Sequence, residues 1–178
     1  MSNKRLLDGK KILIVDDEHD ILDVLEELLF MCEVTKASTF DEAKKYLESH
    51  EFDLAILDIM GVDGYGLLDI ATEKNIPAVM LTAHALTPDN VVRSIKEGAA
   101  SYIPKDELSN IADFLMDVLT AKTEGVNPWA PWQERLPSSY FERKWGAAWQ
   151  DKDKAFWETF RAGLKARKSA AEKSDSRK

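Results

Sequence analysis

Residues 54–66 read LAILDIMGVDGYG, an apolar run that ends in Asp58 and continues into a short loop with Gly61, Asp63 and Gly64. A carboxylate at the exit of a buried strand is costly unless it finds a partner, because an unpaired charge loses its hydration. Asp58 therefore requires a cation or a hydrogen-bond donor close by. The candidates lie at the ends of other apolar runs in the chain.

Short apolar runs alternate with segments of helical periodicity over the first part of the chain. The runs predicted as strands are 11–15, 33–37, 52–57, 76–81 and 100–103, and the predicted helices cover 21–29, a segment after Thr39, 64–71, 88–96 and 108–119. Thr39 and Thr87 followed by Pro88 are typical of helix starts. Strands that alternate with single helices predict right-handed crossovers and a doubly wound α/β domain with a parallel sheet.

Polar groups lie at the carboxyl ends of these predicted strands, where doubly wound sheets form their sites. Asp16 and Asp17 follow the first strand, Asp58 ends the third, Thr82 ends the fourth and Lys105 follows the fifth. Three carboxylates at one edge repel unless a cation intervenes, and such hard oxygen ligands favour Mg²⁺. Lys105 and the Thr82 hydroxyl suit the oxygens of a phosphoryl group. The residues therefore predict a site for a divalent metal and phosphoryl transfer.

Each of these groups also has a purely structural interpretation. Asp16 and Asp17 are acids of the kind that helix N-termini favour, and Asp58 is a candidate cap for the next helix. Taken alone, Lys105 is typical of a solvated surface lysine, and Thr82 is an ordinary strand-end residue. Their occurrence together, each at the proper strand end, favours the functional interpretation.

The motifs ILIVDDE, ILDIMGVDGY, VMLTA and SYIPKD occur in this order and resemble the receiver domain of two-component response regulators, over residues 11 to about 120. The resemblance implies a flavodoxin-like five-stranded parallel sheet of strand order 2-1-3-4-5. It also implies that an aspartate at the end of the third strand accepts a phosphoryl group from a phosphohistidine, with Mg²⁺ required. The donor is then a sensor histidine kinase or a histidine phosphotransfer protein.

By position, the resemblance implies that Asp58 is the phosphoacceptor. It further implies that Asp17 ligates Mg²⁺ directly, that Asp16 supports the metal through water, and that the backbone carbonyl of Met60 is a ligand. Met60 and His84 also occupy positions that tune the lifetime of the phosphoryl group in this family.

The remaining implied roles concern the phosphoryl group and the switch. Thr82 and Lys105 are expected to contact the phosphoryl oxygens, and Ala83 leaves room for them. Tyr102 occupies the switch-aromatic position. Its ring is expected to turn inward when Thr82 moves, which changes the face formed by the fourth helix, the fifth strand and the fifth helix.

Two departures from the family pattern lie next to this site. Only residues 59–62 separate Asp58 from Asp63, whereas the family usually has a longer loop with a Met-Pro segment. Asp106 follows Lys105 where the family commonly has a proline after a cis bond. A cis bond before a residue other than proline costs about 3–4 kcal/mol, which favours a trans bond here.

The features of two other classes of protein are missing. Haloacid-dehalogenase phosphatases carry a second acid two residues after the nucleophile, where this chain has Met60. Neither GxxxxGK[ST] nor GxGxxG occurs in the chain. We therefore do not expect an enzyme.

The last third of the chain differs in composition from the rest. Residues 1–121 contain 11 Lys and Arg against 24 Asp and Glu, whereas residues 122–178 contain 13 against 8, which gives net charges of −13 and +5. All five tryptophans lie in the second part. We expect a receiver over 1–121, a linker with Pro and Trp over 122–138, and an aromatic helical tail over 139–178.

The linker contains three prolines, which predict an extended segment. In the tail, Ser139 and Glu142 fit a capping box, Gly146 predicts a break, and Asp151 is expected to cap a second helix. Large aromatic side chains recur on one face of these helices. The final residues, 168–178, have a composition typical of disorder.

The aromatic face has three interpretations: packing on the chain's own receiver, a surface for a homodimer or another protein, or nucleic-acid binding. Basic residues accompany the aromatics, namely Arg161, Lys165, Arg167 and Lys168. No second recognition helix is predicted, so we do not expect a nucleic-acid partner.

Two further features concern the environment of the protein. Cys32 is the single cysteine, which excludes an internal disulfide, and its apolar surroundings predict a buried, unreactive thiol. The N-terminus carries charges up to a short apolar run, unlike a signal peptide or a membrane span. We expect a cytoplasmic protein without membrane insertion.

Together these features predict a response regulator in which phosphorylation of Asp58 switches a protein-interaction surface for an unidentified downstream partner. A phosphorelay intermediate that passes the phosphoryl group on is the alternative, followed by a DNA-binding regulator that uses the basic tail.

Overall fold

The structure is a computed structural model that describes residues 6–83 and 87–175. By its internal contacts the chain divides into two compact units, Met1–Leu119 and Thr120–Lys178, called here the first and the second unit. Among the described residues, no helix is both long and apolar enough to cross a membrane.

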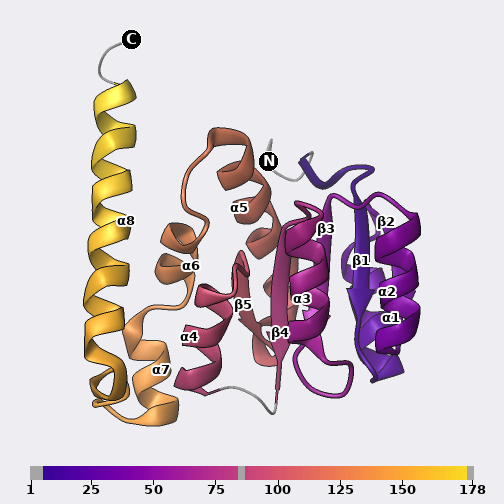
Figure 1. The fold of residues 1–178 in the computed structure, drawn as a ribbon, viewed down its shortest axis with the longest axis horizontal. Helices are drawn as coiled ribbons and strands as arrows, with labels where there is room; N and C mark the ends of the chain where they lie inside the picture. The colour runs from indigo at the N-terminus through magenta and orange to yellow at the C-terminus, as the bar shows by residue number, and fades with distance from the viewer. Residues whose placement is uncertain (1–5, 84–86, 176–178) are drawn as a thin grey trace. The chain divides into compact units, whose positions relative to one another are not determined.

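Five parallel strands form a single sheet in the first unit, in the order β2-β1-β3-β4-β5 (Figure 1). The strands are β1 (Lys11–Val15), β2 (Glu33–Ala37), β3 (Leu54–Asp58), β4 (Ala78–Thr82) and β5 (Ser101–Pro104). The elements between and after them are α1 (His19–Leu28), α2 (Phe40–Ser49), α3 (Gly64–Glu73), α4 (Pro88–Lys96), the 3₁₀ helix η2 (Lys105–Asn110) and α5 (Ile111–Glu124). The predicted fold class and strand order are confirmed.

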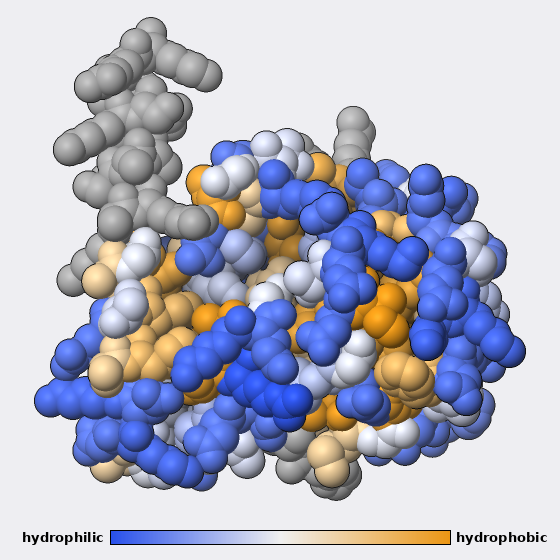
Figure 2. All heavy atoms as spheres, viewed as in Figure 1, coloured by the Kyte–Doolittle hydropathy of each residue, from blue (hydrophilic) through white to orange (hydrophobic). Residues whose placement is uncertain are grey.

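Burial along the strands follows their place in the sheet. Every residue of β3 and of β4 is buried, as expected of central strands that are covered on both faces. The edge strand β2 is mostly half-buried, which explains why its sequence EVTKA tolerates a lysine and a glutamate. Figure 2 shows a largely hydrophilic surface with apolar side chains exposed between the charged ones.

Local capping explains where the helices begin. Thr39 Oγ1 accepts a hydrogen bond from the amide of Glu42 at 3.2 Å, and Thr87 Oγ1 accepts one from the amide of Asn90, also at 3.2 Å. Pro88 occupies the first turn of α4, where its missing N–H leaves no acceptor unpaired. Both predicted helix starts are confirmed.

The cap of α3 and the start of α5 differ from the sequence interpretation. Asp63, not Asp58, caps α3, and its backbone is left-handed with φ of 50°. The helix predicted over 108–119 begins later, at Ile111, and continues to Glu124, because residues 105–110 form the tighter 3₁₀ helix η2.

The thiol of Cys32 is half-buried and donates a hydrogen bond to the carbonyl of Leu7 at 3.3 Å. Burial raises the pKa of this thiol to about 11, and the negative charge of Asp8 adds to the rise. The thiol therefore stays protonated near neutral pH, which agrees with the predicted lack of reactivity.

The second unit contains the end of α5, followed by α6 (Trp129–Arg135), α7 (Ser138–Trp145), the 3₁₀ helix η3 (Asp151–Asp153) and α8 (Lys154–Asp175). The prediction of an extended segment over 122–138 is wrong, because most of this stretch is helical. Its prolines are placed where helices accept them: Pro128 precedes α6, Pro131 lies in the first turn of α6, and Pro137 precedes α7.

Other predictions for the tail are corrected in part. Gly146 ends α7 with a φ of 88°, as predicted. The capping box of Ser139 and Glu142 does not form, because α7 already begins at Ser138 after Pro137, with no side-chain cap. Asp151 begins the short η3 rather than α8. Helix α8 is described as far as Asp175, into the stretch whose composition is typical of disorder, and residues 176–178 lie outside the described residues.

Aromatic rings from α6, α7, α8 and the turn after α7 pack against one another. A circuit of ring contacts, with centroids 4.9–6.3 Å apart, joins Trp129, Trp132, Phe141, Trp149, Trp157 and Phe160 and returns to Trp129. Such spacings are favourable for aromatic pairs. The aromatic residues of the tail therefore build a core of the second unit.

Candidate functional site

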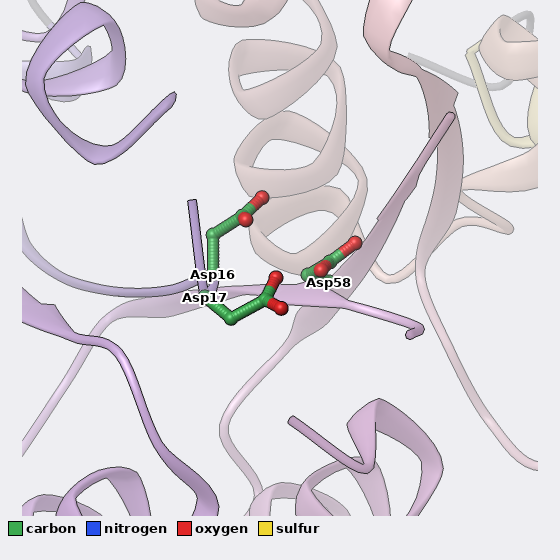
Figure 3. Close-up of side chains that lie close together, drawn as sticks. All are labelled: Asp16, Asp17 and Asp58. Atoms are coloured by element: carbon green, nitrogen blue, oxygen red, sulfur yellow. The ribbon is translucent and has the colours of Figure 1, made fainter. Parts of the chain in front are cut away.

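The carboxyl ends of β1 and β3 lie side by side, because these strands are parallel neighbours with Val15 opposite Leu57. This register places Asp16 opposite Asp58, with Asp17 one residue further on. The carboxylates of the three aspartates offer oxygens that all lie within 4.8 Å of one another. Figure 3 shows the three carboxylates gathered at this edge of the sheet.

The three aspartates differ in their exposure. Asp16 is fully buried and Asp58 is 4% exposed, whereas Asp17 is exposed. Asp16 is also held in place, since its Oδ1 accepts a hydrogen bond from the amide of Glu18 at 2.8 Å. Asp16 precedes Glu18, the N-cap of α1, so this hydrogen bond orders the turn that leads into the helix and is compatible with a role in the cluster.

Lys105 brings the positive charge of the site from the start of η2, directly after β5. Its ammonium lies 2.9 Å from Asp16 Oδ2 and 3.6 Å from Asp58 Oδ1. It also lies 3.7 Å from Glu18 Oε2, a residue to which the sequence interpretation assigned no role. Asp16 Oδ2 is otherwise without a hydrogen-bond partner. Peptide bonds of the described residues are all trans, including Lys105–Asp106.

One ammonium does not balance this cluster of carboxylates. Burial, followed by the charge of Asp16, raises the pKa of Asp58 to about 7, although Lys105 acts in the opposite direction. Burial also raises the pKa of Asp16 against the effect of Lys105. Burial alone would lower the pKa of Lys105, but its ion pairs outweigh burial and raise it.

These residues fit a divalent cation. The oxygens of two buried carboxylates and one exposed carboxylate form a hard donor set, which is what Mg²⁺ prefers. The excess negative charge at Asp58 is the quantity that a cation would offset. The exposed Asp17 leaves one side of the cluster open to water, and Mg²⁺ usually retains several waters.

The structure describes all but one of the other predicted site residues. Thr82 is the last residue of β4 and is buried, one position beyond the register partner of Asp58. Met60 follows β3 with its side chain 56% exposed. Tyr102, in β5, is fully buried and hydrogen-bonds with the backbone of Thr87. Ala83 is exposed, and His84 lies outside the described residues.

The short loop after β3 turns sharply beside the cluster. Gly61 has a φ of 85°, and the amide of Gly64 donates to the carbonyl of Ile59 at 3.3 Å. A Cβ at Gly61 would lie 2.4 Å from Asp17 Oδ2, and one at Gly64 would lie 2.2 Å from the carbonyl oxygen of Asp58. Both glycines are visible in the sequence, but nothing in the sequence shows that Gly61 lies against the Asp17 side chain and Gly64 against the backbone of Asp58.

A comparison with protein families matches residues 12–115 to the response regulator receiver domain. The chain is 40% identical over 114 residues to two-component response regulator ARR18 of Arabidopsis thaliana, a match that covers 58% of this chain and 18% of ARR18. It spans about a fifth of the length of the Arabidopsis regulators that it matches. The acidic triad is typical of the receiver Mg²⁺ site.

Solved structures of receiver domains are also similar. A CheY-like response regulator receiver domain protein from Methanospirillum hungatei JF-1 superposes with a TM-score of 0.54 at 30% identity, covering 64% of this chain and 98% of that chain. NtrX from Brucella abortus gives a TM-score of 0.56 at 30% identity, covering 65% of this chain and 28% of that chain. Since the family match spans more than half of its length, the chain belongs to the response regulator receiver domain family, a non-enzymatic signalling family.

Proposed function

We propose that Asp58 accepts a phosphoryl group from the phosphohistidine of a sensor histidine kinase or a histidine phosphotransfer protein, with Mg²⁺ bound, and that this switches a protein-interaction surface. The observation that carries the proposal is the cluster itself: Asp16, Asp17 and Asp58 converge at the carboxyl edge of the sheet with the ammonium of Lys105 among them.

The transfer would exchange one bond for another at phosphorus. A carboxylate oxygen of Asp58 forms the P–O bond while the P–N bond of the donor breaks, and the electron pair leaves with the imidazole. Asp16, Asp17 and the carbonyl of Met60 are the groups that would hold Mg²⁺. When bound, the ion supplies positive charge that offsets the charges of the carboxylates and of the phosphoryl oxygens.

Lys105 and Thr82 would stabilise the product. The ammonium of Lys105, 3.6 Å from Asp58, is placed to pair with an oxygen of the new phosphoryl group. The Thr82 hydroxyl, at the end of the neighbouring strand β4, would donate a hydrogen bond to another oxygen of the phosphoryl group. The charge of Lys105 and the hydroxyl proton of Thr82 would therefore both offset the negative charge that the phosphoryl group adds to the site.

The switch would run from Thr82 through Tyr102 to the face of α4, β5 and α5. Support comes from the hydrogen bond between Tyr102 and the backbone of Thr87, the residue that caps α4. A movement of Thr82 toward a phosphoryl group changes the space beside β5, and α4 is the element that responds.

Intact mass after incubation with acetyl phosphate and Mg²⁺ tests the proposal. The unchanged chain is expected to gain one phosphoryl group, Asp58→Asn none, and the control Asp69→Asn, an exposed carboxylate on α3, one. Chelation of the metal should abolish the gain. If the chain gains no mass and also fails to bind beryllofluoride, as measured by ¹⁹F NMR, the proposal is wrong.

A further inference from the structure

We propose that Gly61 is a positioning residue for the metal ligand Asp17. Because Gly61 has no side chain, the Asp17 carboxylate can lie against its Cα, in the position from which it would bind the cation. The inference rests on the proposed function, since it assigns a role toward the Mg²⁺ of that site. It concerns a residue of the shortened loop between β3 and α3, which differs from the usual family pattern.

The geometry leaves no space for a side chain at this position. A Cβ on Gly61 would lie 2.4 Å from Asp17 Oδ2, 2.6 Å from Asp17 Cγ and 2.8 Å from Asp17 Oδ1. All three distances are below the normal contact distance between a carbon and these atoms. The carboxylate of Asp17 as a whole, and not a single atom of it, therefore occupies the space beside Gly61.

If a Cβ were introduced at Gly61, Asp17 is the residue that would move to relieve the clash. Its carboxylate is the end of an exposed side chain, so rotation away from the loop is the cheapest response to a new Cβ. Asp16 is fixed by the amide of Glu18 and by Lys105, and it would stay in place. A side chain at Gly61 is thus expected to separate Asp17 from the other two carboxylates.

Gly61 also has a φ of 85°, which strains any residue with a Cβ, so the loss of stability has to be separated from the loss of metal binding. Gly9 supplies the control within the same unit. Its φ is 72°, but a Cβ there would meet nothing within 4 Å. Gly9→Ala therefore introduces comparable backbone strain without touching the site.

The test is a calorimetric titration of the full metal-free chain with Mg²⁺, accompanied by circular dichroism to verify the fold. We expect Gly61→Ala to weaken Mg²⁺ binding on the order of tenfold or more, as displaced supporting groups do at metal sites. Gly9→Ala should lose stability yet keep the affinity of the unchanged chain. Asp17→Asn gives the affinity without the ligand that Gly61 is proposed to place.

A variant that tolerates left-handed backbone covers the case in which Gly61→Ala does not fold. Gly61→Asn keeps the obstructing Cβ with less backbone strain, and it should also bind Mg²⁺ more weakly. Unchanged affinity in a folded Gly61 variant would overturn this inference alone. An unchanged chain that binds no Mg²⁺ at all would overturn the proposed metal site together with it.

Discussion

Asp58 is 4% exposed at the end of β3, and burial, reinforced by the charge of Asp16, raises the pKa of its carboxyl from an ordinary 3.8 to about 7. An acid whose pKa is raised on folding binds a proton more tightly in the folded than in the unfolded state. Its contribution to stability is complete below about pH 4 and is lost as the pH rises toward 7. Without a bound cation, ionisation of Asp58 therefore destabilises the folded state.

The first prediction at this scale concerns the free energy of unfolding of the metal-free chain. Asp58→Asn removes the ionisable group and should stabilise the first unit at pH 8 relative to the unchanged chain, by up to about 4 kcal/mol. The difference should shrink as the pH falls toward 4. Urea unfolding followed by far-UV circular dichroism measures it, since all five tryptophans lie outside this unit.

Asp69→Asn is the control for this comparison, because Asp69 is exposed on α3 and away from the cluster. Its stability should follow that of the unchanged chain across the same pH range. If the stability difference between Asp58→Asn and the unchanged chain did not vary with pH, ionisation of the Asp58 carboxyl would not be what destabilises the fold.

At the scale of elements, the loop after β3 is connected to α4 through Tyr65. The Tyr65 hydroxyl lies 3.0 Å from the carbonyl of Asn90 and 3.1 Å from the hydroxyl of Ser94, both on α4. The guanidinium of Arg93 covers the ring at 3.9 Å from its centroid. Tyr65, which follows Gly64 at the start of α3, thus links the loop after β3 to α4, a helix of the proposed switch surface.

Tyr65→Phe removes these hydrogen bonds and leaves the ring in place. Because Ser94 is buried and keeps its bond to Asn90, the expected loss of stability is moderate, about 1–2 kcal/mol. Urea unfolding of the first unit measures this loss. Tyr46→Phe is the control, since the described contact of Tyr46 is between its ring and that of His50, and its stability should not change.

At the scale of the whole molecule, each unit has a core of its own. The first unit is built around apolar strands, and the second around rings contributed by α6, α7, α8 and the turn after α7. Trp149 is 8% exposed and contacts Phe141, Trp145 and Trp157. Local loss of this core should leave the chemistry at the β1–β3 edge in place.

Trp149→Ala should therefore destabilise the second unit by about 3–5 kcal/mol, while acetyl phosphate still modifies Asp58. Thermal unfolding followed by tryptophan fluorescence reports on the second unit, and intact mass reports on the site. The control Phe30→Ala removes a side chain that is 82% exposed in the first unit, so neither readout should change. Loss of phosphorylation in Trp149→Ala would show that the site depends on the second unit.

Sequence patterns alone predicted the first unit well, because they are consequences of local periodicity. Continuous apolar runs marked β3 and β4, threonines marked the starts of α2 and α4, and the alternation of strands with helices implied a parallel sheet. Since parallel strands end at one edge, the sequence also predicted that Asp16, Asp17 and Asp58 would meet. The prediction of an extended segment over 122–138 failed because it counted prolines and did not consider that helices accept proline before or within their first turn, as at 129–135.

The sequence by itself therefore determined the sheet and the acidic edge, which depend on spacing along the chain. Only the tertiary structure decided that Gly61 faces the Asp17 carboxylate, that Lys105 pairs with Asp16, and that the tail rings close into one core. These contacts join residues that are distant in the sequence. The distances between these residues depend on how the loops turn and how the side chains pack, and periodic patterns along the chain do not determine either.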